Sequence, residues 1–228
     1  MIENAFFEEI WNITLLSLKV SGTSVLIGAL IGIPIGAVLG FRQFRGKRAL
    51  MRFADIALKS VINTFMGLPP VVVGLAVYLL LTTSGPLGWL GLLYTPTAMI
   101  ITQLIMVVPI IIGVTMSAVG GVEKSIREKA LSLGATEIQA AWQVLREARM
   151  GVLTSIIVAF GAAISEVGGI MMTGGNIRWV TRTLTTAIVV ETELGNFNLA
   201  LMLGAILLSM AFVINLALTI IQVKGAKR

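Results

Sequence analysis

Residues 128–149, EKALSLGATEIQAAWQVLREAR, form a polar stretch between two long apolar runs. Residues 125–133, which overlap its beginning, are rich in Ala, Leu, Glu and Lys, which favour helix. Gly134 then suits the left-handed conformation in which many helices end. Thr136 is a good N-cap for a second helix over residues 137–149, where apolar residues recur at helical spacing. The stretch therefore predicts a helix, a glycine turn and a second helix.

The composition indicates an integral membrane protein. Of the 228 residues, 57% are hydrophobic and 12% are charged, and the mean hydropathy is +0.96. Soluble domains average about 45–50% apolar and about 25% charged residues. The net charge of +6 is therefore better explained by the Lys/Arg bias of cytoplasmic membrane loops than by a nucleic-acid surface. We expect membrane lipid around the chain and no nucleic-acid partner.

Several classes of chemistry are excluded by missing residue types. The chain has no cysteine and no histidine, which excludes disulfides, thiol catalysis, a histidine-based triad and metal sites with His or Cys ligands. It also has no Gly-x-x-x-x-Gly-Lys-Ser/Thr sequence for nucleotide phosphates. We expect a protein that is not an enzyme and that holds no metal and no cofactor of its own. The acidic start of the chain (Glu3, Glu8, Glu9) argues against a removed signal peptide.

The apolar runs predict the fold class. A membrane-spanning helix needs about 20 mostly apolar residues. We expect an all-α, polytopic protein whose single transmembrane domain covers residues 1–228, with a polar loop at 123–149. Its five predicted spans are residues 13–41, 61–81, 96–119, 151–173 and 199–223.

The positions of the cations predict the orientation. The loop 42–59, the loop 123–149 and the end 224–228 hold six, five and three of the 17 Lys and Arg residues. With five spans, these three regions share one side of the membrane. The positive-inside rule then places the amino terminus outside and the carboxyl terminus inside. Arg178 and Arg182 fall on the outer side.

Small residues mark one face of the first span. Gly28, Gly32, Gly36 and Gly40 recur at every fourth residue, which lets a neighbouring helix backbone approach closely. We expect these glycines to pack against another helix, either within this chain or around its rim. Pro34 lies within the same run and should kink the helix.

The second span contains a pair of prolines that should bend or unwind it. Pro69 and Pro70 remove two successive backbone donors. The break is either a structural kink or a place where irregular backbone lines a water-filled path. Thr102 and Gln103 could line such a path with their polar groups. Hydrogen bonds between helices explain them at least as well. Glu166, deep in the fourth span, is expected to act as a gate, a helix-terminus contact or an intersubunit hydrogen bond, or to be only structural.

The polar stretch also carries a family pattern. Glu128-x-Ala130-x-x-x-Gly134-Ala135 resembles the EAA loop of ABC-importer permeases, with Lys129 in place of the family's middle alanine. The resemblance implies a type I permease-like fold and a cytoplasmic loop that docks in a groove of an ATPase subunit. The residues implied for this coupling are Glu128, Ala130, Leu133, Gly134, Ala135 and Trp142. The physical alternative is an interfacial amphipathic hairpin with Trp142 as its headgroup anchor.

Other segments narrow the family. The stretch Gly67-Leu68-Pro69-Pro70 followed by Gly74 is similar to molybdate-type permeases, and so is the run from Ser165 to Ile188. The form of that run, with Met-Met before the glycines and Val190-Glu191-Thr192 after them, is closest to tungstate-transport permeases. The resemblance implies a permease of a prokaryotic cell (inner) membrane that imports an oxyanion, tungstate or alternatively molybdate. The implied partners are a second copy of the chain, two cytoplasmic ABC ATPase subunits that bind ATP and Mg, and an extracytoplasmic oxyanion-binding protein.

The outer polar loop offers a docking surface for such a binding protein. Asn176, Arg178 and Arg182 are the candidates, with a solvated charge pair as the alternative. Two rival classes fit less well. An ion-coupled secondary transporter would show inverted repeats and several intramembrane ion ligands. A membrane hydrolase would need a nucleophile with a base, and neither His nor Cys is present.

Overall fold

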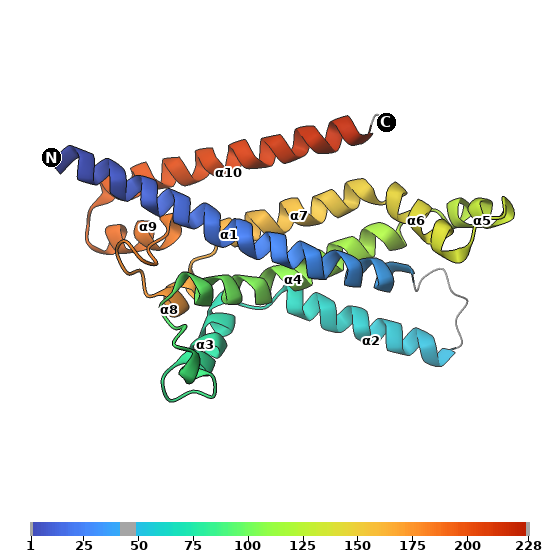
Figure 1. The fold of residues 1–228 in the computed structure, drawn as a ribbon, viewed down its shortest axis with the longest axis horizontal. Coiled ribbons are helices and arrows are strands. Elements are labelled where there is room, and N and C mark those ends of the chain that lie inside the picture. Colours follow the sequence, from blue (N-terminus) through green and yellow to red (C-terminus); the bar gives the residue numbers. More distant parts are fainter. Residues whose placement is uncertain (1, 42–48, 227–228) are drawn as a thin grey trace. The chain divides into compact units, whose positions relative to one another are not determined.

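A computed structural model of the protein describes residues 2–41 and 49–226, and it is helical throughout most of that part of the chain (Figure 1). The helices are α1 (Ile2–Phe41), α2 (Ala49–Met66), α3 (Pro70–Leu81), η2 (Gly88–Leu90), α4 (Pro96–Gly120), α5 (Lys124–Ser132), α6 (Glu137–Glu147), α7 (Arg149–Ile164), α8 (Gly168–Gly174), α9 (Leu184–Glu193) and α10 (Phe197–Ala226). Six of the cations used to predict the orientation lie outside the described residues: Arg42, Arg45, Lys47, Arg48, Lys227 and Arg228.

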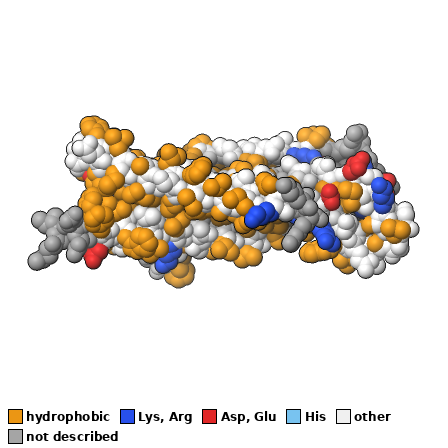
Figure 2. Space-filling model, turned by 90° about the horizontal axis from the view of Figure 1, so that it is seen from above, with side chains coloured by type: hydrophobic (Ala, Val, Ile, Leu, Met, Phe, Trp, Pro, Cys, Tyr) orange, Lys and Arg blue, Asp and Glu red, His pale blue; other side chains and the backbone are white. Residues whose placement is uncertain are grey.

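The described helices include several long enough to cross a membrane. They are Phe6–Phe41 of α1, α4, and Phe197–Lys224 of α10, and the number rises to five if each of two bent helix pairs counts as one span. The bent pairs are α2 with α3, and α6 with α7, which meet at 57°. Figure 2 shows apolar side chains spread over the visible face, as expected for a surface in contact with lipid. The predicted all-α membrane fold is confirmed.

The predicted bend at the proline pair is present. Helix α2 ends at Met66, Pro69 has extended dihedral angles, and α3 begins at Pro70. Proline is well suited to the first position of a helix because it has no N–H to leave unpaired. Helix α2 begins earlier than expected, at Ala49, so much of the predicted loop 42–59 is helical.

Two other elements differ from the prediction. The expected fourth span, residues 151–173, is not one helix, because α7 ends at Ile164 and α8 begins only at Gly168. The expected outer loop contains α9, which starts with a capping box between Thr183 and Thr186. Thr186 Oγ1 accepts the Thr183 N–H at 3.0 Å, and Ser17 Oγ of α1 accepts the Leu184 N–H at 2.8 Å, so hydroxyl groups satisfy the first backbone donors of α9.

The described chain divides into two compact units. The first unit comprises the chain up to Leu26 with Leu68–Val107 and Phe160–Ala217, and the second comprises Ile27–Gly67, Val108–Ala159 and the chain from Leu218. The core of the first unit includes Val20, Met99 and Ile170. The core of the second joins α1, α4 and α6 through Ala37, Val119 and Val144.

The glycine face of α1 packs within the second unit. A Cβ added to Gly32 would lie 2.8 Å from Ile111 Cγ2, and one added to Gly36 would lie 2.7 Å from the carbonyl oxygen of Ile112. Gly40 meets α4 in the same way. The small residues therefore let α1 and α4 approach closely inside the chain, as predicted. Helix α1 stays continuous across Pro34.

Candidate functional site

The turn between α5 and α6 is built by the motif that the sequence singled out. Gly134 has a φ of +87°, its N–H donates to Leu131 O at 3.0 Å, and the Ala135 N–H donates to Ala130 O at 3.1 Å. This pair of hydrogen bonds around a left-handed residue is the Schellman motif, which satisfies the last carbonyls of a helix. Three of the four motif positions thus have a shared structural task, which is to end α5 sharply.

The second helix of the hairpin starts with an equally well-defined cap. The Thr136 N–H donates to Gln139 Oε1 at 2.8 Å, and the Gln139 N–H donates to Thr136 Oγ1 at 3.3 Å. A cap of this kind stabilises a helix by about 1 kcal/mol. Arg127 Nη2 also donates to Glu137 Oε2 at 2.6 Å, which ties α5 to α6. The predicted helix–turn–helix is confirmed, and contacts within it fix its shape.

Helix α6 has one buried face and one exposed face. Ala140 and Val144 are fully buried, and Val144 belongs to the core of the second unit. On the other side, Ile138 is 83% exposed and Trp142 is 68% exposed, and Leu133 before the turn reaches 89%. Apolar side chains of this size, gathered on one short hairpin, mark a surface for a partner or a membrane. Figure 2 shows Lys and Arg together with Asp and Glu side chains gathered mostly toward the right-hand end of the visible face.

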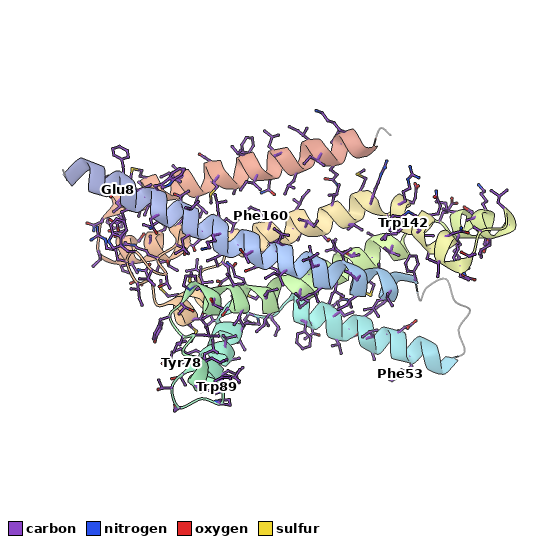
Figure 3. The ribbon with its side chains drawn as sticks, in the orientation of Figure 1. Glu8, Phe53, Tyr78, Trp89, Trp142 and Phe160 are labelled. Carbon is purple, nitrogen blue, oxygen red and sulfur yellow. The ribbon has the colours of Figure 1, made fainter. Side chains whose placement is uncertain are left out.

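The predicted coupling residues divide between the shape and the surface of this hairpin. Leu133 and Gly134 lie at its tip, and both are exposed together with Glu128. Ala130 and Ala135 are half-buried and make the turn. Trp142 lies farther along, on the exposed face of α6 near its junction with α7 (Figure 3).

A second candidate site lies in the first unit, where the two helix breaks meet. Gly169, in the first turn of α8, is the point of contact. A Cβ added there would lie 2.8 Å from Thr102 Cγ2, 3.0 Å from Pro70 O and 3.3 Å from Glu166 Oε1. Helix α3 packs directly on α8. The structure thus brings together three of the predicted pathway residues, and Pro69 directly precedes one of them.

Glu166 caps the helix that follows it. Its Oε1 accepts the Gly169 N–H at 2.6 Å, its Oε2 accepts the Ile170 N–H at 3.0 Å, and the side chain is buried. Thr185 Oγ1 of α9 donates to the Glu166 carbonyl oxygen at 2.9 Å. A carboxylate at the start of a helix satisfies unpaired N–H groups and complements the helix dipole. Of the alternatives given for Glu166, the helix-terminus contact is the one observed.

Thr102 and Gln103 hold α4 to its neighbours. Thr102 Oγ1 hydrogen-bonds Thr173 Oγ1 at 3.0 Å, and Gln103 Nε2 donates to Ala163 O at 2.8 Å. Both side chains are buried. Gln103 Oε1 is also buried and has no hydrogen-bond partner within the described residues. The helix–helix interpretation of these two residues therefore has direct geometric support.

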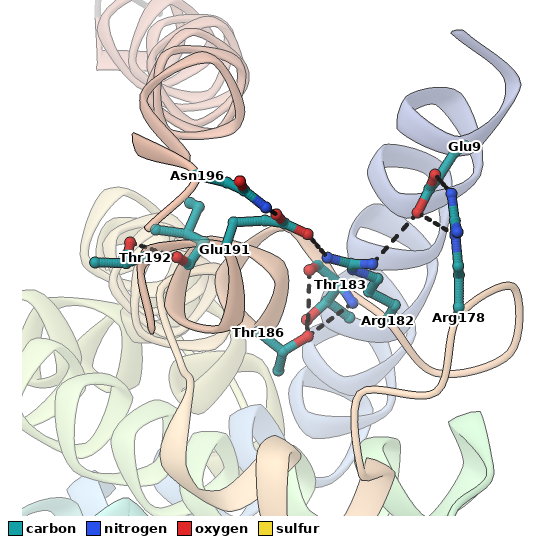
Figure 4. A network of polar contacts seen from close by, with 9 residues as sticks. Glu9, Arg178, Arg182, Thr183, Thr186, Glu191, Thr192 and Asn196 are labelled. Atoms are coloured by element: carbon teal, nitrogen blue, oxygen red, sulfur yellow. Dashed lines mark hydrogen bonds and ion pairs between the residues drawn. The ribbon is translucent and has the colours of Figure 1, made fainter. Parts of the chain in front are cut away.

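The outer loop is held by a network of charges (Figure 4). Glu9 of α1 pairs with both Arg178 and Arg182, and Arg182 also pairs with Glu191 of α9. Asn196 Nδ2 donates to Glu191 Oε2 at 2.8 Å. This hydrogen bond, helped by the Arg182 guanidinium and opposed by burial, holds the pKa of Glu191 below its ordinary value.

The network determines which of the three docking candidates is exposed. The Arg182 side chain is only 11% exposed and serves as an internal tie, whereas 62% of the Arg178 side chain is exposed. Asn176 has a positive φ of +49°, and its Oδ1 is buried without a hydrogen-bond partner in the described chain. Glu9 was not among the expected site residues. The signal for it was present, because the orientation places the acidic amino terminus on the same side as both arginines.

Comparison with known proteins agrees with these features. Residues 32–225 match the family described as binding-protein-dependent transport system inner membrane component. A probable anion ABC transporter permease protein of Haloferax volcanii is 46% identical, over 90% of this chain and 87% of the relative. The tungstate uptake system permease protein TupB of Peptoclostridium acidaminophilum is 37% identical, over 96% and 92%.

More distant matches agree in sequence or in fold. The molybdenum transport system permease protein ModB of Escherichia coli (strain K12) is 29% identical, over 78% of this chain and 77% of the relative. The fold resembles that of a chain of the MetNI methionine ABC transporter in an inward-facing conformation, with a TM-score of 0.71, 16% identity, and coverage of 96% and 95%. This chain is therefore a member of the family of binding-protein-dependent transport system inner membrane components.

Proposed function

We propose that this protein is the transmembrane permease subunit of an ATP-driven importer whose cargo is tungstate. The observation that carries the proposal is the hairpin of α5 and α6, which is held by hydrogen bonds and an ion pair of its own and exposes Leu133 beside Gly134 at its tip. A rigid element with open apolar side chains is suited to dock in a groove of another protein and to transmit its motion. In this proposal ATP and Mg are bound by separate cytoplasmic ATPase subunits, which agrees with the lack of a phosphate-binding motif in this chain.

The relatives support tungstate as the proposed cargo. The tungstate permease named above aligns over nearly the whole chain, and the Haloferax relative is named for an anion. Molybdate is the alternative, because the molybdenum permease also aligns over 78% of the chain. In this proposal selectivity lies in an extracytoplasmic binding protein, and Arg178 is the exposed member of the docking surface.

Two copies of the chain would enclose the translocation path between two ATPase subunits. Closure of the ATPases around ATP would move the paired hairpins together and switch the cavity between inward- and outward-facing states. The site where the helix breaks meet, around Pro70, Glu166 and Gly169, is the proposed gate. Broken helices are tolerated at membrane depth where they are buried in protein or line a water-filled cavity.

Reconstitution tests the proposal. The permease, its ATPase and its binding protein are placed in liposomes, and tungsten uptake is measured by elemental mass spectrometry with and without ATP. ATP-dependent uptake in the presence of the binding protein is expected, with molybdate and sulfate as competitors to rank the cargo. Uptake driven by an ion gradient without ATP would refute the proposal.

A further inference from the structure

The second unit contains a groove of about 620 Å³ where α6 meets α7. The junction is bent by 57°, and Figure 3 shows Trp142 on α6 beside the start of α7. The groove is lined by Ile33, Trp142, Leu145, Arg146, Arg149, Val152 and Leu153. Apart from Trp142, none of these residues has a part in the roles described above.

The lining has two chemically different ends. Ile33 of α1 and Val152 and Leu153 of α7 supply hydrocarbon, whereas Arg146 in the last turn of α6 and Arg149 at the start of α7 supply guanidinium groups. Arg146 is exposed and forms no ion pair with any residue in the described part of the chain.

The cationic and the apolar parts of the lining together favour an amphiphilic ligand. A small oxyanion would pair with the arginines but would leave the hydrocarbon wall uncovered. A purely apolar ligand would cover the wall but would leave the charge of Arg146 without a counter-ion. A ligand with an anionic head and a hydrocarbon chain matches both ends.

The position of the groove points to the same ligand. Helix α6 brings the cation Arg146 and the exposed ring of Trp142 to the groove, whereas α7 is an apolar helix of 16 residues, so the groove straddles the change from water-facing to membrane-facing surface. Tryptophan is enriched at such boundaries, where its ring lies at headgroup level. The orientation inferred from the cations places this boundary at the cytoplasmic leaflet, which carries the anionic lipids.

We propose that this groove binds an anionic phospholipid of the cytoplasmic leaflet. Its phosphate lies at Arg146 and Arg149, and one acyl chain runs along Ile33, Val152 and Leu153. The lipid would brace the junction between the proposed coupling hairpin and α7. The binding itself requires only the membrane orientation and goes beyond the proposed transport function.

Native mass spectrometry of the full chain in detergent tests the proposal, with phosphatidylglycerol and phosphatidylcholine titrated separately. The wild type is expected to retain phosphatidylglycerol in preference to phosphatidylcholine. Arg146→Gln should weaken phosphatidylglycerol binding about fivefold, the effect of one cation near a lipid headgroup. Lys124→Gln removes an exposed charge on α5, outside the groove, and should change nothing.

A second variant and a competition complete the test. Leu153→Trp fills the hydrocarbon end and should weaken the binding of both lipids without changing the charge. Equal retention of the two lipids by the wild type, or equal behaviour of Arg146→Gln and Lys124→Gln, would overturn the proposal. Displacement of the lipid by millimolar inorganic phosphate or tungstate would also overturn it and would identify a small-anion site. These measurements use no ATPase, so their failure leaves the transport proposal standing.

Discussion

Gly74 of α3 lies against Gly169 of α8 so closely that a Cβ added to Gly74 would lie 2.5 Å from Gly169 Cα. The obstacle is backbone and not the end of a flexible side chain, so it has little room to yield. The two segments that follow the helix breaks therefore meet backbone to backbone, and their spacing is set by the absence of side chains.

We predict that Gly74→Ala lowers the free energy of unfolding by about 1–3 kcal/mol, the usual cost of an overpacked core. Thermal unfolding in detergent, followed by circular dichroism, measures the effect. Gly161→Ala in α7 is the matched control, because a Cβ there meets no atom within 4 Å and alanine favours helix. Equal melting temperatures for the two variants would contradict the packing described here.

Glu166→Gln tests whether the buried carboxylate is a helix cap. Glutamine offers one carbonyl oxygen where two backbone N–H groups now find two acceptors, so the variant should lose about 1–3 kcal/mol of stability. Glu193→Gln, at an exposed position of α9, is the control. If Glu166 serves only as a cap, transport per folded complex stays unchanged. A loss of transport at full stability would indicate a direct part in gating.

The outer network predicts a specific response to acid. The folded-state pKa of Glu191 lies below its ordinary value of 4.5, so its stabilising contribution is fully present above pH 4.5 and is lost as the pH falls through the folded pKa. Glu191→Gln should lower the melting temperature at neutral pH and flatten its fall below pH 4.5. Asn196→Ala removes the main cause of the shift and should move the acid transition upward. Parallel curves for the wild type and Glu191→Gln would refute this role.

Gly134→Val should separate ATP hydrolysis from transport. Valine is disfavoured at a φ of +87°, so the turn that ends α5 would have to change shape and the tip residue Leu133 would move. Gly134→Asn is the control, because asparagine tolerates the left-handed conformation. In the reconstituted complex, the valine variant should lose substrate-stimulated turnover, whereas the asparagine variant should keep most of it. Normal turnover in the valine variant would exclude the hairpin as the coupling element.

The hairpin was predictable from sequence because its signals are local. Gly134 at the end of one helix and Thr136 at the start of the next act through hydrogen bonds to residues three to five positions away. The bend at Pro69 and Pro70 was predictable for the same reason, since proline changes its own backbone. The all-α class followed from the length of the apolar runs.

The features that hydropathy missed depend mainly on contacts distant in sequence. The break between Ile164 and Gly168 lies inside a mostly apolar run, and besides the local cap from Glu166 it is held by a hydrogen bond from Thr185, 19 residues farther along the chain. The threonines of α9 are typical of a polar loop, yet Thr185 and Thr186 are buried. Glu9 and Arg178 pair across 169 residues of sequence. The sequence indicates only that both residues lie on the same side of the membrane.

The helix caps of the α5–α6 hairpin use only residues of the hairpin itself, and this has a consequence for protein engineering. Its turn and its inter-helix ion pair come from residues 124–147 alone, and the face that it buries includes side chains as small as Ala140. We therefore expect the segment to be exchangeable between permeases that keep the apolar contacts of Val144 with α1 and α4. We expect that grafting it onto a related permease would transfer the preference for a particular ATPase, while the host's cargo stays the same.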